Sequence, residues 1–318
     1  LVASIAPGSQ TQLTASVTGP DNKSVRWSIS PTVGSISQSG IYTAPATVGA
    51  STDVTITATS FADPTKKATA KLTIAPTSNS IVFTAAGVVN GATFKGGGVA
   101  PGEIITVFGA GFGASSLTGL SVGSDGKVTT VSGGTSILFD GVPAPMVYAV
   151  SGQLAAVVPY SVAGKSTSQV QIAYNGALSS AVAVPIATAA PGFFTANSSG
   201  AGQLAMFNQD YSLNNSANPA ARGSIVLLYG TGEGQTDPPG VDGQVNNTVF
   251  PKPVLPVRVT IGGVDAQVAY FGAAPGFVAG VFQANVVVPA NAPTGASVPI
   301  QVFLGTNTSP SGTTIAVK

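Results

Sequence analysis

The sequence contains no histidine and no cysteine among its 318 residues, and only 7% of its residues are charged. Histidine is the usual general base and the commonest transition-metal ligand, so its absence excludes a Ser-His-Asp triad and a histidine zinc site. The absence of cysteine excludes disulfides and thiol chemistry. The net charge of +1 is small and evenly spread, which argues against nucleic acid as a partner.

Long hydrophobic runs are also missing, and none reaches the roughly 18 residues that a membrane-spanning helix needs. We therefore expect no membrane insertion. The 40 glycines and 23 prolines, with many Ser, Thr and Val residues, favour short strands joined by turns. We predict an all-β protein of three tandem Ig-like β-sandwich domains, spanning 1–76, 77–193 and 194–318. Residues 75–80 read as a short linker.

The first predicted domain alternates polar and apolar residues in short segments separated by turn signals, as Ig-like sandwiches do. Segments 25–31, 34–37 and 40–45 resemble a bacterial Ig-like domain. We expect Trp27 in its core, the alternative being a sugar-stacking platform with Tyr42 and Phe61.

Domains of this kind usually open with a strand upstream of the segment that matches residues 4–8, and only three residues precede it here. We therefore expect an unfilled sandwich edge and self-association of copies through it, because unpaired backbone groups can accept a strand from a neighbour. The alternative is a short first strand with a solvated edge. The candidate residues for self-association are Leu1, Val2, Ala3, Ser4 and Ile5.

The rest of the chain contains a duplicated module. An apolar strand that runs into a Gly-x-Gly turn occurs at 104–113 and again 121 positions later at 225–234. Three further matches follow in the same order, with offsets that change only where loops are expected: 139–144 with 261–266, 153–159 with 283–289, and 171–174 with 301–304. We predict that Gly109 and Gly230 occupy equivalent turns, and Tyr148 and Tyr270 equivalent strand positions.

Each copy resembles an IPT/TIG-type immunoglobulin-like fold. Together they resemble the uncharacterised C-terminal domain of large secreted acidobacterial proteins, on the motifs at 88–94, 99–103, 152–160, 190–195, 218–220 and 230–234. The resemblance covers roughly 81–318 and implies an exported, surface-associated module without known catalytic residues. A chain that begins at Leu1 is what removal of a signal peptide would leave, and a truncated sequence would begin in the same way.

The remaining motifs give weak signals of chemistry. The Gly109-x-Gly111 and Gly230-x-Gly232 turns lack the third glycine of a dinucleotide-binding loop, so we interpret them as tight turns with positive φ, and we expect no cofactor. Ser124 and Lys127 match the spacing of a Ser-Lys nucleophile pair but read as an exposed turn.

Three carboxylates, Glu233, Asp237 and Asp242, lie in one glycine- and proline-rich loop. Such a loop could hold calcium, although its spacing matches no known calcium loop and an ordinary solvated loop is the alternative.

These observations favour a non-enzymatic extracellular structural or adhesive protein that associates with copies of itself through edge strands. A low, balanced charge opposes close packing of copies only weakly. One alternative is a module that binds carbohydrate, for example surface glycans, or another ligand; clustered exposed aromatic residues would favour it. The other is an enzyme, which would need a concave pocket lined by at least two close carboxylates.

Overall fold

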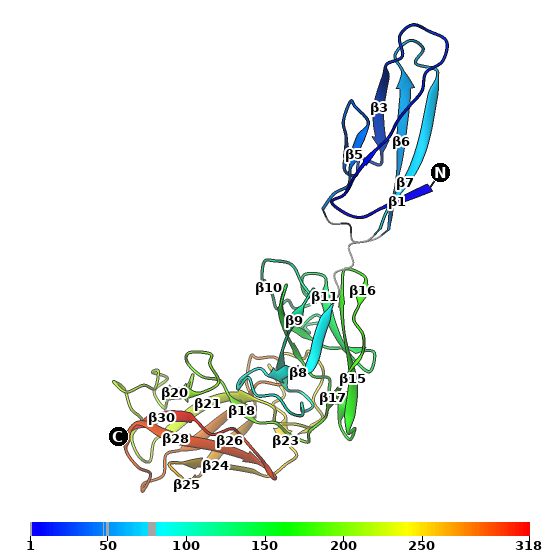
Figure 1. Ribbon diagram of the computed structural model, residues 1–318. Coiled ribbons are helices and arrows are strands. Elements are labelled where there is room, and N and C mark those ends of the chain that lie inside the picture. Colours follow the sequence, from blue (N-terminus) through cyan, green and yellow to red (C-terminus); the bar gives the residue numbers. More distant parts are fainter. Residues whose placement is uncertain (1, 47, 49–50, 76–80) are drawn as a thin grey trace. The chain divides into compact units, whose positions relative to one another are not determined.

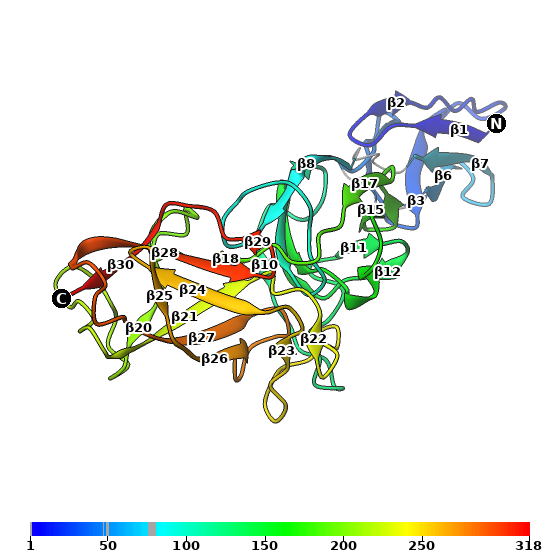
Figure 2. The same cartoon turned by 90° about the horizontal axis from the view of Figure 1, so that it is seen from below.

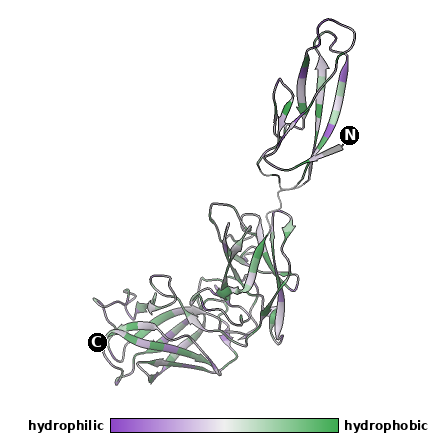
Figure 3. Ribbon diagram, viewed as in Figure 1, coloured by the Kyte–Doolittle hydropathy of each residue, from purple (hydrophilic) through white to green (hydrophobic). Residues whose placement is uncertain are grey.

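The computed structural model describes residues 2–46, 48, 51–75 and 81–318, and the chain divides into two compact units, 1–79 and 80–318 (Figure 1). Nearly all of its regular structure is β-strand, which confirms the prediction of all-β, Ig-like sandwiches. Hydrophobic and polar residues alternate along many strands, as strands with one buried face require (Figure 3). Apart from Ala75, the predicted linker lies outside the described residues.

The first unit is a small sandwich. One sheet has the strand order β1-β7-β6-β3 and the other β2-β5-β4. Their bounds are β1 (Val2–Ile5), β2 (Gln10–Gln12), β3 (Val25–Ser30), β4 (Ser35–Ile36), β5 (Ile41–Thr43), β6 (Thr52–Ser60) and β7 (Lys67–Ile74). Trp27 packs, partly buried, against a core that includes Tyr42 and Ile56. Because Tyr42 is fully buried, it cannot form an exposed platform with Trp27 and Phe61.

The edge that we expected to be open is filled by the N-terminal segment of the same chain. Strand β1 pairs in parallel with β7, from Val2 opposite Lys71 to Ile5 opposite Ile74. The expectation of an unfilled edge is therefore wrong, because Val2 and Ala3 together with Ser4 and Ile5 form a strand that continues the ladder of β7. Leu1 lies outside the described residues.

The second unit begins with a sandwich of two sheets, β10-β13-β14-β9-β8 and β12-β11-β15-β16, with β17 also paired to β15. The bounds are β8 (Val82–Asn90), β9 (Ile104–Ala110), β10 (Thr118–Gly119), β11 (Thr135–Phe139), β12 (Val142–Pro143), β13 (Met146–Val150), β14 (Gln153–Val157), η1 (Tyr160–Val162, a 3-10 turn), β15 (Thr167–Tyr174), β16 (Ala177–Leu178) and β17 (Val182–Pro185). Ile105, Phe112, Ile137 and Leu154 are among its fully buried core residues.

The following sandwich has the sheets β18-β21-β27-β26, with β20 on β21, and β19-β30-β28-β24-β25, with β29 on β28 (Figure 2). A further pair, β22-β23, lies in a loop. The bounds are β18 (Gly192–Phe193), β19 (Gly202–Gln203), β20 (Phe207–Asn208), β21 (Ile225–Thr231), β22 (Thr236–Asp237), β23 (Lys252–Pro253), β24 (Val257–Ile261), β25 (Val264–Ala266), β26 (Val268–Ala273), β27 (Phe282–Val287), β28 (Gly295–Leu304), β29 (Asn307–Thr308) and β30 (Thr313–Val317). Phe193 already belongs to its core, so this sandwich begins before the predicted boundary at 194.

The strand registers of the two sandwiches match. Strands β13 and β14 pair with a bulge that places Tyr148 opposite Ala155, and β26 and β27 pair with the same bulge, which places Tyr270 opposite Asn285. The pairs β11–β15 and β24–β28 repeat each other in the same way, with Ile137 opposite Ile172 and Val259 opposite Val302. The predicted duplication is therefore confirmed.

Gly109 and Gly230 are equivalent, but they lie inside strands and not in turns. Each pairs with a phenylalanine of the neighbouring strand, Phe83 or Phe193. A Cβ on Gly230 would lie 2.3 Å from the ring of Phe282, so glycine is needed there for close approach. The positive φ angles that we predicted belong instead to the second glycines, Gly111 at 79° and Gly232 at 85°.

Candidate functional site

The two sandwiches of residues 80–318 share an apolar core where they meet, which we call the joint. It buries side chains from both repeats: Ile104, Val128 and Val157 from the first, and Ala274, Val278 and Val281 from the second. Backbone hydrogen bonds also cross it, such as that from the Val128 N–H to the Gly243 carbonyl at 2.8 Å. Two sandwiches with a common core and shared backbone hydrogen bonds resist independent motion.

Thr231, at the end of β21, connects the two backbones at the joint. Its buried hydroxyl accepts a hydrogen bond from the Ile104 N–H at 2.7 Å and donates one to the Gly280 carbonyl at 2.7 Å. Gly280 has φ of +108°, and a Cβ there would lie 2.1 Å from the carbonyl oxygen of Gly102. Only glycine permits this approach of the second sandwich to the first.

Two carboxyl groups are buried beside Thr231. Glu103, just before β9, is 0% exposed, and Glu233, just after β21, is 2% exposed. Glu103 Oε2 accepts a hydrogen bond from the Ala100 N–H at 2.6 Å. Glu103 Oε1 and Glu233 Oε2 have no hydrogen-bond partner among the described residues.

Burial raises the pKa of both carboxyl groups to about 8, and the charge of Glu233 adds to the rise at Glu103. Both groups are therefore mainly protonated at neutral pH. Glu103 was missed in the sequence analysis; the signal for it was a lone acidic residue directly before the apolar strand 104–107.

Glycoside hydrolysis also uses two carboxyl groups, but there only the general acid has a raised pKa and its partner stays ionised, whereas both pKa values are raised here. Catalysis by such a pair requires both groups to reach the scissile bond, and Glu103 is completely buried. In this structure the two groups are buried carboxylic acids inside the joint, mainly protonated at neutral pH.

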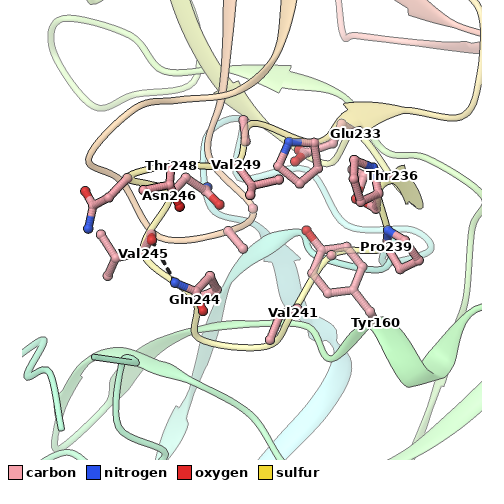
Figure 4. Close-up of a pocket in the computed structure, with 17 residues that line it drawn as sticks. Tyr160, Glu233, Thr236, Pro239, Val241, Gln244, Val245, Asn246, Thr248 and Val249 are labelled. Carbon is pink, nitrogen blue, oxygen red and sulfur yellow. Dashed lines mark hydrogen bonds between the residues drawn. The ribbon is translucent and has the colours of Figure 1, made fainter. Parts of the chain in front are cut away.

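A cavity of about 310 Å³ adjoins Glu233 (Figure 4). Three of its sides are formed by Tyr160 from the first sandwich and by Glu233 and Asn246 from the second. The Tyr160 hydroxyl points into the cavity. Tyr160 is held in place through its backbone, because its N–H donates to Asp242 Oδ1 at 2.9 Å and its carbonyl accepts from Gln235 Nε2 at 3.1 Å.

The three predicted calcium ligands have different surroundings. Glu233 is buried at the joint, Asp237 is exposed in β22, and Asp242 accepts the Tyr160 N–H. Within the described residues, no three acidic, histidine or cysteine side chains are grouped closely enough to hold a metal ion. Calcium binding stays a prediction.

A row of aromatic side chains lies on the second sandwich. The ring centroids of Phe207 and Tyr229 are 6.3 Å apart, and those of Tyr229 and Phe277 are 5.8 Å apart. Phe277 is 50% exposed, and Tyr211 is 74% exposed. Burial raises the pKa of Tyr229, and the charge of Tyr211 adds to the rise. Across the ladder from Tyr229 lies Gln283, whose amide donates to Asn285 Oδ1 at 2.8 Å. Exposed aromatic residues beside amides are what the binding-module alternative requires.

No protein-family model matches the chain, and no curated protein matches it. Solved structures with weak similarity include SGBP-B of a Bacteroides ovatus mixed-linkage glucan utilization locus, in complex with a mixed-linkage heptasaccharide. It has 14% identity and a TM-score of 0.27, over 100% of this chain and 67% of that one. The tandem Ig repeats of Dlar have 11% identity and a TM-score of 0.22, over 76% of this chain and 99% of that one.

The Sidekick-1 immunoglobulin domains 1–4 have 13% identity and a TM-score of 0.18, over 99% of this chain and 73% of that one. Likenesses this weak carry no conclusion about ligands or partners, and the fold class follows from the strand pairing described above. In the part of the chain that the structure describes, no helix is long and apolar enough to cross a membrane.

Proposed function

We propose that this chain is a non-catalytic extracellular module with a structural or adhesive role, in which residues 80–318 act as one rigid body. The observation that carries the proposal is the joint, where Thr231 connects Ile104 to Gly280 and an apolar core is shared. A rigid double sandwich holds its two ends at a fixed separation, which is what a spacer or an adhesive stalk needs. We also propose that the chain is exported with cleavage of a signal peptide, and that it belongs to the acidobacterial C-terminal domain family.

Self-association through edge strands completes the proposal. The first-unit sheet ends at β1 on one side and β3 on the other, and both present backbone groups that a copy could pair with. Electron microscopy of the purified chain, with sedimentation velocity over a range of concentrations, tests it. Filaments or concentration-dependent oligomers support self-association, and a monomer at every concentration contradicts it.

The absence of catalysis is tested by screening glycoside, ester and peptide substrates. Turnover that Glu233→Gln abolishes would show that the buried carboxyl pair is an active site, and would overturn the non-catalytic part of the proposal.

Ligand binding is the second candidate function, and the aromatic row favours it. Aromatic faces stack on the C–H faces of sugar rings, and neighbouring amides bind hydroxyl groups. Phe277→Ala should weaken retention of the chain on insoluble polysaccharide. Phe61→Ala, which removes a comparably exposed ring from the first unit, should leave retention unchanged.

A further inference from the structure

The cavity beside Glu233 has two polar groups on its wall that lack partners. Asn246 is 3% exposed, and its Nδ2 finds no acceptor among the described residues. Glu233 Oε2, on another side of the cavity, also has no partner among the described residues. Buried polar groups in folded proteins are nearly always hydrogen-bonded, so two unpartnered groups at one cavity indicate that an occupant supplies the missing bonds.

The chemistry of these groups defines the occupant. The Asn246 N–H can only donate, whereas a carboxyl group and the Tyr160 hydroxyl can each donate or accept. A hydroxyl group on the ligand satisfies both kinds of partner, because it accepts from one and donates to another. Apolar side chains, among them Pro238, Pro251 and Val249, line another part of the cavity and suit the C–H face of a ring. Four further polar residues also line it: Thr236, Gln244, Asn247 and Thr248.

We propose that this cavity binds one residue of a neutral saccharide, with its hydroxyl groups hydrogen-bonded to Asn246, Glu233 and Tyr160. The cavity is at the small end of the roughly 300–1,000 Å³ typical of ligand sites, which fits a single ring. The inference is separate from the aromatic row, which lies outside the residues that line the cavity.

Other occupants fit less well. An anion would find no lysine or arginine among the residues that line the cavity. An organic cation would face the Asn246 N–H and a Glu233 carboxyl group that burial keeps mainly protonated at neutral pH. A single water occupies about 30 Å³ of liquid, so several waters fill the cavity when no ligand is bound, and a saccharide would displace them.

Saturation-transfer NMR and titration calorimetry on the full chain test the proposal. The probes are methyl glycosides of glucose, galactose, mannose and N-acetylglucosamine, with n-butylammonium as the cationic comparison. Asn246→Asp keeps the shape of the side chain and replaces the unpartnered donor with an acceptor. We expect it to weaken saccharide binding about tenfold or more. Asn197→Asp, the same change at an exposed turn away from the cavity, should leave binding within about twofold.

Blocking the cavity gives an independent test that leaves its polar groups intact. Val249 lines the cavity and is 54% exposed, so Val249→Trp can fill the space without disturbing the core. It should abolish binding, whereas Val254→Trp, at a residue that does not line the cavity, should not. Circular dichroism and thermal melting establish that each variant is folded.

The proposal is supported if a saccharide binds and both Asn246→Asp and Val249→Trp remove that binding while Phe277→Ala does not. It is overturned if no glycoside of the panel binds, if binding survives both cavity variants, or if only n-butylammonium binds. A crystal structure grown with the saccharides that shows ordered water alone in the cavity would also overturn it. None of these outcomes depends on whether the chain self-associates.

Discussion

Tyr148 and Tyr270 occupy the same place in two copies of one ladder, each directly after a β-bulge and opposite a residue of the neighbouring strand, Ala155 or Asn285. Their hydroxyl groups differ in role. Tyr148 accepts from Gln153 Nε2, whereas Tyr270 donates to the Ala273 carbonyl at 2.8 Å. The duplicated backbone has therefore been kept while the side-chain contacts on its outer face have diverged.

A second equivalent pair lets the duplication be tested energetically. The Ser179 hydroxyl accepts the Ile172 N–H at 2.9 Å, and the Ser309 hydroxyl accepts the Val302 N–H at 3.1 Å. Because both bonds are buried, Ser179→Ala and Ser309→Ala should each destabilise the chain by about 1–3 kcal/mol in urea unfolding. Ser180→Ala, at an exposed neighbour, is the control and should change little. A large loss at one serine with none at the other would mean that the two sites are not energetically equivalent.

Thr231→Val tests the hydrogen-bonded connection at the joint. The change keeps the shape of the side chain but leaves the Ile104 N–H and the Gly280 carbonyl without their partner. We expect a loss of about 1–3 kcal/mol in the free energy of unfolding. Thr167→Val, on an exposed position of β15, should have almost no effect. If Thr231→Val and Thr167→Val lower the free energy of unfolding equally, the hydrogen bonds of Thr231 do not stabilise the joint.

Most of the fold could be predicted from the sequence, because strand alternation and internal repetition are local patterns. The matches at 104–113 and 225–234 led directly to equivalent strands. The joint could not be predicted, because it depends on how two sandwiches pack. Thr231 has an alanine, Ala110, at the equivalent position of the first repeat, and nothing local marks it as a connector. Asn246 likewise becomes notable only through its burial, whereas Glu103 had one local signal, its position directly before an apolar strand.

The two buried carboxyl groups predict how stability depends on pH. In the unfolded chain a glutamic acid loses its proton near pH 4.5, whereas Glu103 and Glu233 keep theirs up to about pH 8. Folding therefore binds protons in this window, and stability should fall as pH rises from about 4.5 to about 8. The slope should approach about 1.4 kcal/mol per pH unit for each group.

Carboxyl groups with a lowered pKa do not obscure this window. The pKa of Asp140, lowered to about 2 by Lys165 and its other hydrogen-bond donors, affects stability only at more acid pH. Urea unfolding at a series of pH values measures the slope. Glu103→Gln and Glu233→Gln should each flatten it, and an unchanged slope in both variants would contradict the assignment.

Self-association through β1 predicts a specific effect of charge. Ser4 is exposed in this edge strand, and a lysine on an edge opposes pairing with a copy. Ser4→Lys should shift the sedimentation of the chain toward monomer. Ser16→Lys adds the same charge at an exposed position outside the strands and should not. If both variants dissociate the protein equally, the effect is one of net charge and β1 is not the contact.

Rigidity of the joint is the central claim, and the distance between the two sandwiches tests it most directly. The chain has no cysteine, so spin labels at Gln169→Cys and Gln267→Cys, one exposed site in each sandwich, would be the only labels present. A pair at Gln267→Cys and Thr308→Cys, within the second sandwich, gives the reference. Pulsed electron–electron double resonance measures the distances between the two labels. The distance distribution across the joint should be as narrow as that of the reference pair. A broad or two-peaked distribution across the joint, with a narrow reference, would contradict the account.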